Sequence, residues 1–264
     1  MAENTLVLTP GGYRDRSLVH HVPPGHVLDY ADGRMAIRNL KTDIATEVPP
    51  SEAKGPTLGE GWIASACWVN DTQTPLTQFC SGWQVPEPPT VQDDQVIYLF
   101  NGLQPPGGYA ILQPVLQWGV SAAGGGPYWS VASWYAVSSG HSFHTNAEPV
   151  DVDEVLLGKI TLINRQGAYF SYNCQFSGHP QTELNIVNFP ELSCCFEVLE
   201  AYSITQCPNY PASPSTRFFF IQVDYGNVGH PLNWVTRASV TDCGQHVVVV
   251  DPSPVKGEVE IFYR

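Results

Sequence analysis

The sequence predicts an all-β protein, an antiparallel β-sandwich of the jelly-roll type, and three observations support this fold class. From about residue 61 onward, short segments of aromatic and β-branched residues alternate with clusters of Pro, Gly, Asn and Asp. No stretch repeats apolar residues at intervals of three and four, so any helix is expected to be short. The 264-residue chain also contains 23 Pro and 23 Gly, which favours many turns over long regular helices.

The first sixty residues differ from the rest of the chain. They are rich in Pro, Gly and charge, with short periodic runs only at His26 to Tyr30 and Arg34 to Leu40. We therefore expect residues 1–60 to form a partly irregular N-terminal extension with one or two strands, which can pack over a sandwich domain at residues 61–264. The strands expected in that domain are 61–69, 79–85, 95–99, 109–118, 128–137, 156–163, 168–176, 195–202, 216–223, 233–239, 246–250 and 258–263.

The charge balance excludes some classes of partner. With 12 Lys and Arg against 25 Asp and Glu, the net charge is −13, so the surface field repels phosphate backbones and anionic membranes. No apolar run approaches the length of a membrane span, and the first residues lack the basic and apolar regions of a secretory signal. We expect neither nucleic acid nor membrane as a partner. The compartment stays unassigned.

Metal and cofactor sites are not expected from the cysteines and histidines. The seven cysteines include no pair of CxxC motifs at zinc spacing, and their odd number leaves at least one unpaired within the chain. His141 and His144 are three residues apart, which places them on opposite faces of a strand unless the backbone turns, and His20-His21 could join them. Exposed loop histidines are the simpler interpretation.

The segment from Gly107 to Gly119 contains the first candidate site residue. In a strand, Gln113 and Gln117 lie on one face with Tyr109, while Leu112 and Trp118 lie on the other. An amide on a sheet face is unfavourable to bury without a hydrogen-bond partner, so Gln113 should meet solvent, a side chain or a substrate. Pro114 cannot donate a ladder hydrogen bond, which predicts a bulge, an interruption or a missing partner there.

The second candidate is a carboxyl group in the segment from Cys194 to Tyr202. Alternation places Glu200 on the same face as Phe196, Val198 and Tyr202. Burial among apolar and aromatic neighbours raises the pKa of a carboxyl, which suits a group that exchanges protons during a reaction. The simpler alternative is a structural carboxylate at the rim of the sandwich.

Taken together, these two segments resemble the eqolisins, a family of secreted glutamic peptidases with a concanavalin-like β-sandwich. The segment Ala110-Ile111-Leu112-Gln113 matches the A-I-L-Q motif of the family, and Glu200 after Leu199 matches its later glutamate. Looser matches, over about residues 61–250, are Val85-Pro86, Asn101-Gly102, Trp118, Trp134-Tyr135 and Thr241-Asp242-Cys243. The resemblance implies that Gln113 and Glu200 form a catalytic pair and that the protein is secreted.

The resemblance further implies a hydrolase that acts in acid as an endopeptidase. In that mechanism the Glu200 carboxylate activates water, and the Gln113 amide stabilises the oxyanion. The groove around the pair would include Asn101, Gln117, Trp134 and Tyr135. The chain departs from the family pattern because Asn101, Gln117 and Ala136 stand where the family has acids. Loss of nearby negative charge removes one cause of a raised pKa at Glu200.

Two other functions remain open. The Gln/Glu pair could serve proton transfer on a small molecule, which predicts a closed pocket, covered in part by residues 1–60. The chain could instead be a carbohydrate-binding module, because several tryptophans could line a stacking groove. A polypeptide substrate predicts an open groove, and residues 1–60 could then act as a propeptide.

Overall fold

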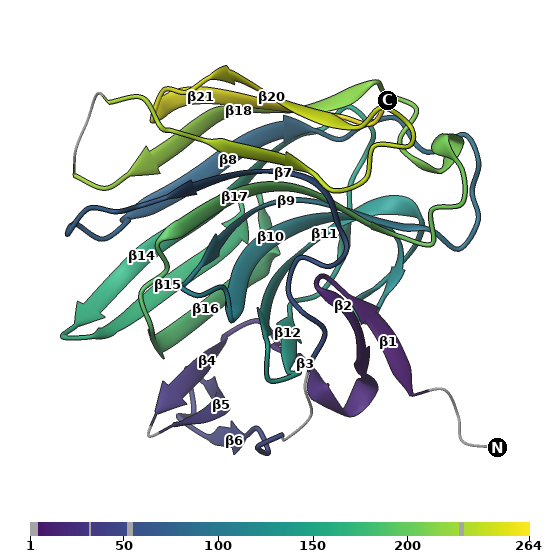
Figure 1. Cartoon of the computed structure of the whole chain (residues 1–264). Helices are drawn as coiled ribbons and strands as arrows, with labels where there is room; N and C mark the ends of the chain where they lie inside the picture. The colour runs from purple at the N-terminus through teal and green to yellow at the C-terminus, as the bar shows by residue number, and fades with distance from the viewer. Residues whose placement is uncertain (1–4, 32, 52–54, 227–229) are drawn as a thin grey trace.

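Two β-sheets stacked face to face form the body of the protein in the computed structural model, which describes residues 5–31, 33–51, 55–226 and 230–264 (Figure 1). The nine-stranded sheet has the spatial order β19 (Val235–Ala238), β7 (Trp62–Val69), β17 (Cys194–Tyr202), β9 (Val96–Gln104), β10 (Ala110–Ser121), β11 (Gly124–Val137), β12 (Ser142–His144) and β3 (Val19–His21), with β13 (Glu148–Pro149) paired to β11.

The second sheet has ten strands. Their spatial order is β20 (His246–Asp251), β21 (Val255–Phe262), β18 (Ser215–Asp224), β8 (Gln78–Gln84), β14 (Val155–Gln166), β15 (Tyr169–Phe176), β16 (His179–Phe189), β4 (His26–Ala31), β5 (Arg34–Asn39) and β6 (Ala45–Glu47). A separate hairpin is formed by β1 (Leu6–Thr9) and β2 (Gly12–Asp15). The described helices are two 3-10 turns, η1 (Arg16–Leu18) and η2 (Cys207–Asn209), and none is long enough to cross a membrane.

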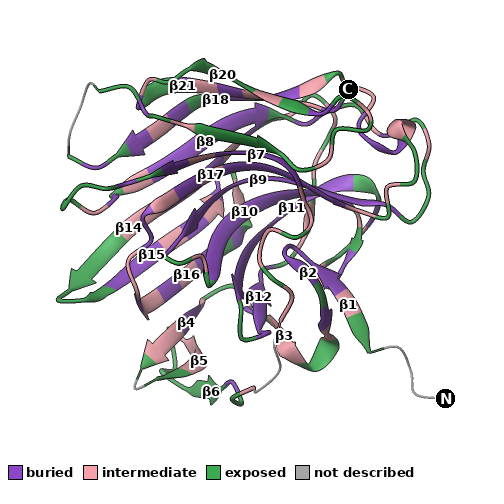
Figure 2. Ribbon diagram, in the orientation of Figure 1, coloured by how far each residue is buried: buried purple, intermediate pink, exposed green. Residues whose placement is uncertain are grey.

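Each central strand of the nine-stranded sheet buries both of its faces. On the inner face, Leu99, Leu116 and Leu199 pack in one core with side chains of the opposite sheet such as Phe218. On the outer face, Tyr98, Phe100, Val115 and Val198 form a second apolar cluster. Figure 2 shows this double burial as nearly continuous purple along β9 and β10. A strand covered on both faces has few exposed positions, and these strands therefore read as almost uninterrupted apolar runs.

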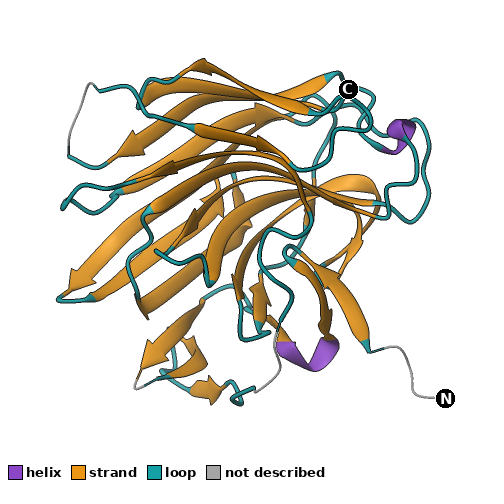
Figure 3. Ribbon diagram, viewed as in Figure 1, coloured by secondary structure: helices purple, strands orange, loops and turns teal. Residues whose placement is uncertain are grey.

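The all-β prediction is confirmed, as strands dominate the ribbon in Figure 3. All twelve segments expected in the sandwich domain correspond to strands, although β9 and β11 extend further than predicted. The strand β16 was not anticipated. The strand β10 continues through Pro114 without a register shift. Its pairing with β11 is unbroken at this point, whereas its pairing with β9 skips Gln113 and Pro114.

The N-terminal segment is more ordered than expected. Its described part contains six strands rather than one or two, while residues 1–4, 32 and 52–54 lie outside the described residues. The strands β3 and β4 extend the two sheets by parallel pairing with β12 and β16, respectively. Parallel pairs join residues far apart in sequence, so no local turn signal reveals them. The extension is therefore built into both sheets.

Candidate active site

Glu200 lies on the outer face of β17, in the middle of the nine-stranded sheet. β17 is hydrogen-bonded to β7 on one side and β9 on the other, which fixes the backbone beneath the carboxyl group. A register shift between Leu199 and Glu200 brings Trp62 of β7 opposite Glu200. The side chain is completely buried.

The two carboxyl oxygens of Glu200 have different surroundings. Oε1 accepts hydrogen bonds from the Tyr202 hydroxyl at 2.6 Å and from the Gly11 backbone N–H at 2.7 Å. Oε2 is buried and has no regular hydrogen-bond partner among the described residues. One oxygen is thus anchored by two donors, and the other has no donor at regular hydrogen-bond geometry.

Burial raises the pKa of Glu200 from its usual 4.5 to about 7, and four groups oppose this shift. The hydroxyl of Tyr202, the N–H of Gly11, the indole of Trp62 and the Arg14 guanidinium all favour the carboxylate and lower the pKa. The rise expected from the sequence is therefore present, with burial as its main cause. A carboxyl group with a pKa near neutrality can both accept and donate a proton.

Gly11 reaches Glu200 because the β1–β2 hairpin lies on the outer face of the sheet. The hairpin turns at Pro10-Gly11, and Gly11 adopts a φ of 87°, a conformation that strongly favours glycine. Leu8 packs into the outer apolar cluster. The buried Arg14 donates to the Val137 carbonyl at 3.1 Å, and burial lowers its pKa to about 10, so it stays charged at neutral pH. The hairpin thus covers the face that carries the carboxyl group.

Gln113 lies on this same outer face, opposite Trp134 of β11. Its side chain is 1% exposed and makes no hydrogen bond within the described part of the chain, and its Oε1 is fully buried. No hydrogen bond joins it to Glu200. The residue of β10 level with Glu200 is Gln117, through Tyr98 of β9, so Gln113 and Glu200 lie diagonally across the face.

Gln117, the second glutamine predicted for the site, is occupied by structural contacts. Its Nε2 donates to the carbonyls of Gly119 at 2.8 Å and Gly124 at 2.9 Å, and its Oε1 accepts from the Ser121 hydroxyl at 2.7 Å. These bonds brace the turn between β10 and β11. Gln117 is therefore poorly placed to bind a substrate without releasing that turn.

The other three predicted site residues divide between the two faces. Trp134 lies on the outer face beside Gln113, and its indole nitrogen is buried without a partner among the described residues. Asn101 lies between the sheets, where it donates to the Gly158 carbonyl at 3.4 Å. Tyr135 also points inward and packs against Phe189. The sheet therefore separates Asn101 and Tyr135 from Gln113 and Glu200.

Sequence reasoning missed three of the four groups that act on Glu200, namely Gly11, Arg14 and the indole of Trp62. Tyr202 was recognisable, because alternation puts it on the same face two residues along the strand. Gly11 and Arg14 carried no such signal. The Pro10-Gly11 pair indicates a turn, but nothing in the sequence shows that this turn contacts Glu200, which lies 189 positions further along the chain. A buried second carboxyl, Glu197, points inward and accepts a hydrogen bond from Ser81.

The four histidines noted in the sequence are brought together by β3 and the segment around β12. His20 Nε2 and His141 Nδ1 are 3.0 Å apart, and the rings of His21 and His144 lie at 5.5 Å. Burial and the neighbouring histidines lower the pKa of His20 to about 4. Among the described residues no group of three ligand-type side chains could hold a metal ion.

An open cavity of about 530 Å³ lies beside Tyr202, the residue whose hydroxyl donates to Glu200. Gly12 and Tyr13 of the hairpin, Tyr202 and Tyr210 are among its lining residues. The Tyr202 hydroxyl belongs both to this cavity's wall and to the hydrogen bonds of Glu200. The cavity therefore reaches Tyr202, a hydrogen-bond partner of Glu200, but Glu200 itself is not among its lining residues.

Comparisons with known proteins reveal similarity in structure only. No family model matches the sequence, and no curated protein matches it in sequence. A crystal structure of scytalido-glutamic peptidase with a peptide-based transition-state analogue is 12% identical, with a TM-score of 0.50, and the match covers 78% of this chain and 99% of that one. SCP-B, of the eqolisin family, in complex with the tripeptide Ala-Ile-His gives 12% identity, the same coverage and a TM-score of 0.49. At this identity the similarity shows a shared β-sandwich fold.

Proposed function

We propose that the chain is a hydrolase of the glutamic-peptidase type, with Glu200 as the group that activates water. The observation that carries this proposal is the buried carboxyl group, one oxygen anchored by Tyr202 and Gly11 and the other unpartnered. Its pKa of about 7 lets it cycle between both protonation states. The fold shared with scytalido-glutamic peptidase supports a peptide bond as the substrate.

The reaction consumes one water per bond cleaved. The Glu200 carboxylate takes a proton from water, the water oxygen bonds to the carbonyl carbon, and the carbonyl π electrons move onto its oxygen. The Gln113 side-chain N–H donates to that oxyanion. The carbon–nitrogen bond then breaks as protonated Glu200 passes its proton to the leaving amine. Gln113 suits this role because its side chain makes no other hydrogen bond among the described residues.

A polypeptide requires the hairpin to move, because Gly11 occupies Glu200 Oε1 and Leu8 packs on the same face. With the hairpin in place, a substrate would have to enter beside Tyr202 from the cavity of about 530 Å³, which favours a small one. Proton transfer on a small molecule is therefore the second candidate function. The covering hairpin is the specific observation that favours it.

The deciding experiment is hydrolysis of a denatured protein and of small amides and esters between about pH 2 and pH 8, in a range spanning carboxyl pKa values. We expect Glu200→Gln to abolish most activity and Gln113→Ala to lower turnover by ~100-fold or more. Glu87→Gln, a change at an exposed carboxyl, is the matched control and should leave the rate unchanged. Full turnover in Glu200→Gln on every substrate would refute the proposal.

The pH dependence of the hydrolysis rate indicates whether the β1–β2 hairpin covers Glu200 during the reaction. With Glu200 at a pKa of about 7, the active carboxylate becomes about tenfold rarer for each pH unit below 7, so the rate should rise toward neutral pH. Cleavage that is fastest in acid requires a lower pKa, which is expected if the hairpin leaves and the carboxyl regains contact with water. Cleavage of the small substrates alone would support the second candidate.

A further inference from the structure

A second cavity, open to solvent and lined in part by aromatic rings, lies on the opposite side of the nine-stranded sheet from Glu200. It has a volume of about 280 Å³, and Tyr30, Met35, Tyr109, Tyr135 and Phe189 form its walls. Tyr30 and Met35 belong to β4 and β5 of the extension, whereas Tyr135 and Phe189 belong to β11 and β16. The extension and the sandwich therefore build this cavity together, and nothing in the proposed hydrolysis uses it.

The rings of the lining pack partly on one another. Tyr135 and Phe189 meet edge to face, with centroids 4.9 Å apart and planes at 75°. Tyr30 and Phe189 lie 5.5 Å apart at 37°. Tyr135 and Phe189 are 3% and 2% exposed, so the more exposed rings of Tyr30 and Tyr109 offer most of the aromatic surface that a ligand can reach. Tyr135 is almost fully buried and held by its neighbours, so the walls are preformed.

The polar groups of the residues that line this cavity are side-chain hydroxyls and backbone amides and carbonyls. None of the nine residues described around the cavity carries a charge, the remaining four being Val137, Ser138, Ser139 and Pro190. Burial raises the pKa of Tyr135, and the nearby Tyr109 and Tyr30 phenols raise it further. The cavity has no carboxylate with which a primary ammonium could form an ion pair.

We propose that this cavity binds a small organic cation whose nitrogen is methylated, as in a quaternary ammonium group. Such a cation needs no hydrogen-bond acceptor and is attracted by the negative faces of aromatic rings within about 6 Å. A net charge of −13 concentrates cations around the protein. The same negative field repels anions and does not attract a neutral apolar ligand.

The test compares choline with its neutral carbon isostere, 3,3-dimethyl-1-butanol, by calorimetric titration of the intact protein at matched ionic strength. We expect choline to bind about two- to fivefold more tightly, the range of cation–π attraction at an exposed site. Tetramethylammonium should bind and methylammonium should bind less well. Equal affinity for choline and the isostere, or no binding of choline at millimolar concentration, overturns the proposal.

Two substitutions localise the binding to the rings. Tyr109 is 44% exposed, so Tyr109→Leu should preserve the fold, weaken choline binding severalfold and leave the isostere unaffected. Tyr30→Phe keeps the ring and removes only the hydroxyl, so choline affinity should persist. Unchanged choline affinity in Tyr109→Leu, or its loss in Tyr30→Phe, would contradict a ring-based site. Glu200→Gln should have no effect, which separates this inference from the hydrolase.

Discussion

At the scale of single residues, burial acts on Glu200 and Arg14 in opposite directions. It raises the pKa of the carboxyl to about 7 and lowers that of the guanidinium to about 10, since it disfavours the charged form of each. Arg14 remains protonated near neutral pH, whereas Glu200 changes its charge there. Glu200 is thus a side chain on this face that titrates in the physiological range.

Glu200→Gln should change how stability depends on pH. The carboxyl titrates near 4.5 in the unfolded chain and near 7 in the fold, so between these values the native state binds more protons. The contribution of Glu200 to the free energy of unfolding is therefore fully present below pH 4.5. It falls by about 3 kcal/mol as pH rises through 7, for a pKa shift of this size. Urea unfolding at pH 4.5 and 7.5 measures the difference.

The comparison needs an exposed carboxyl as its control. Glu87→Gln alters a solvated side chain and should reproduce the wild-type pH dependence. If Glu200→Gln loses as much stability as the wild type between the two pH values, the carboxyl is not buried as described.

At the scale of elements, the β1–β2 hairpin is held on the sheet by a few contacts. Leu8 is 7% exposed in the outer cluster, whereas Leu6 on the same strand is 52% exposed. Leu8→Ala should open the hairpin locally and speed hydrogen exchange of the Gly11 amide by about 30-fold or more, as expected for a loss of ~2 kcal/mol. Leu6→Ala is the matched control. Equal exchange in the two variants would mean that Leu8 does not anchor the hairpin.

The histidine pair His20 and His141 makes stability depend on pH in the opposite direction to Glu200. His20 on β3 shares a hydrogen bond with His141, and the His144 ring and the Arg14 guanidinium lie close to the pair. Because burial lowers the pKa of His20 to about 4, the unfolded chain binds more protons than the native one between pH 6.5 and 4. The stability contributed by neutral His20 is therefore lost as pH falls through this window.

Acid should thus loosen the parallel pairing of β3 with β12. His20→Gln keeps a hydrogen-bonding side chain without a titrating ring, so exchange of the β3 amides should become less sensitive to pH between 6.5 and 4. Exposed His246 offers the control, since His246→Gln leaves the pairing untouched. An identical acid response in His20→Gln and the wild type would rule out this histidine as the cause.

The strands were predictable from the sequence because each carries its own period, but their long-range partners were not. Alternation assigned Gln113 and Glu200 each to a face of its own strand, only the family resemblance joined the two in one site, and desolvation predicted the raised pKa of Glu200. Alternation did not decide which face of the sheet Asn101 points to. In the structure its side chain lies between the two sheets. The Gly11 hydrogen bond depends on how a remote hairpin packs, a property of tertiary structure rather than of local pattern.

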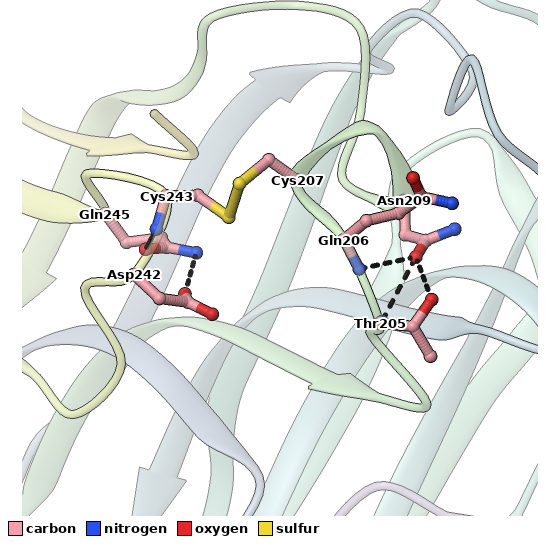
Figure 4. Close-up of a disulfide and its surroundings, with 7 residues drawn as sticks. All are labelled: Thr205, Gln206, Cys207, Asn209, Asp242, Cys243 and Gln245. Carbon is pink, nitrogen blue, oxygen red and sulfur yellow. Dashed lines mark hydrogen bonds between the residues drawn. A yellow bond between two sulfur atoms is a disulfide. The ribbon is translucent and has the colours of Figure 1, made fainter.

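At the scale of the whole molecule, the extension and the disulfide lie at different parts of the sandwich. The extension adds strands to both sheets at their β12 and β16 sides, away from the β19 and β20 sides. The disulfide joins Cys207 of η2 to Cys243, in the loop between β19 and β20 (Figure 4). It therefore ties together two connections that both lead from the nine-stranded sheet, from β17 and from β19, to the ten-stranded sheet. Tyr210 and Asp242, close in sequence to the two cysteines, line the cavity of about 530 Å³.

Loss of this disulfide should destabilise the whole domain. The bond spans 36 residues, and closure of a loop of that length restricts the unfolded chain by about 4 kcal/mol in the chain-entropy description. We expect the double variant Cys207→Ser, Cys243→Ser to unfold at lower urea concentration than the oxidised wild type and to be insensitive to reductant. Cys194→Ser, at a half-buried free thiol, should keep the wild-type response to reductant. If reductant leaves the wild-type unfolding midpoint unchanged, the bond contributes no stability, and the packing of η2 against the sheets holds this end of the sandwich by itself.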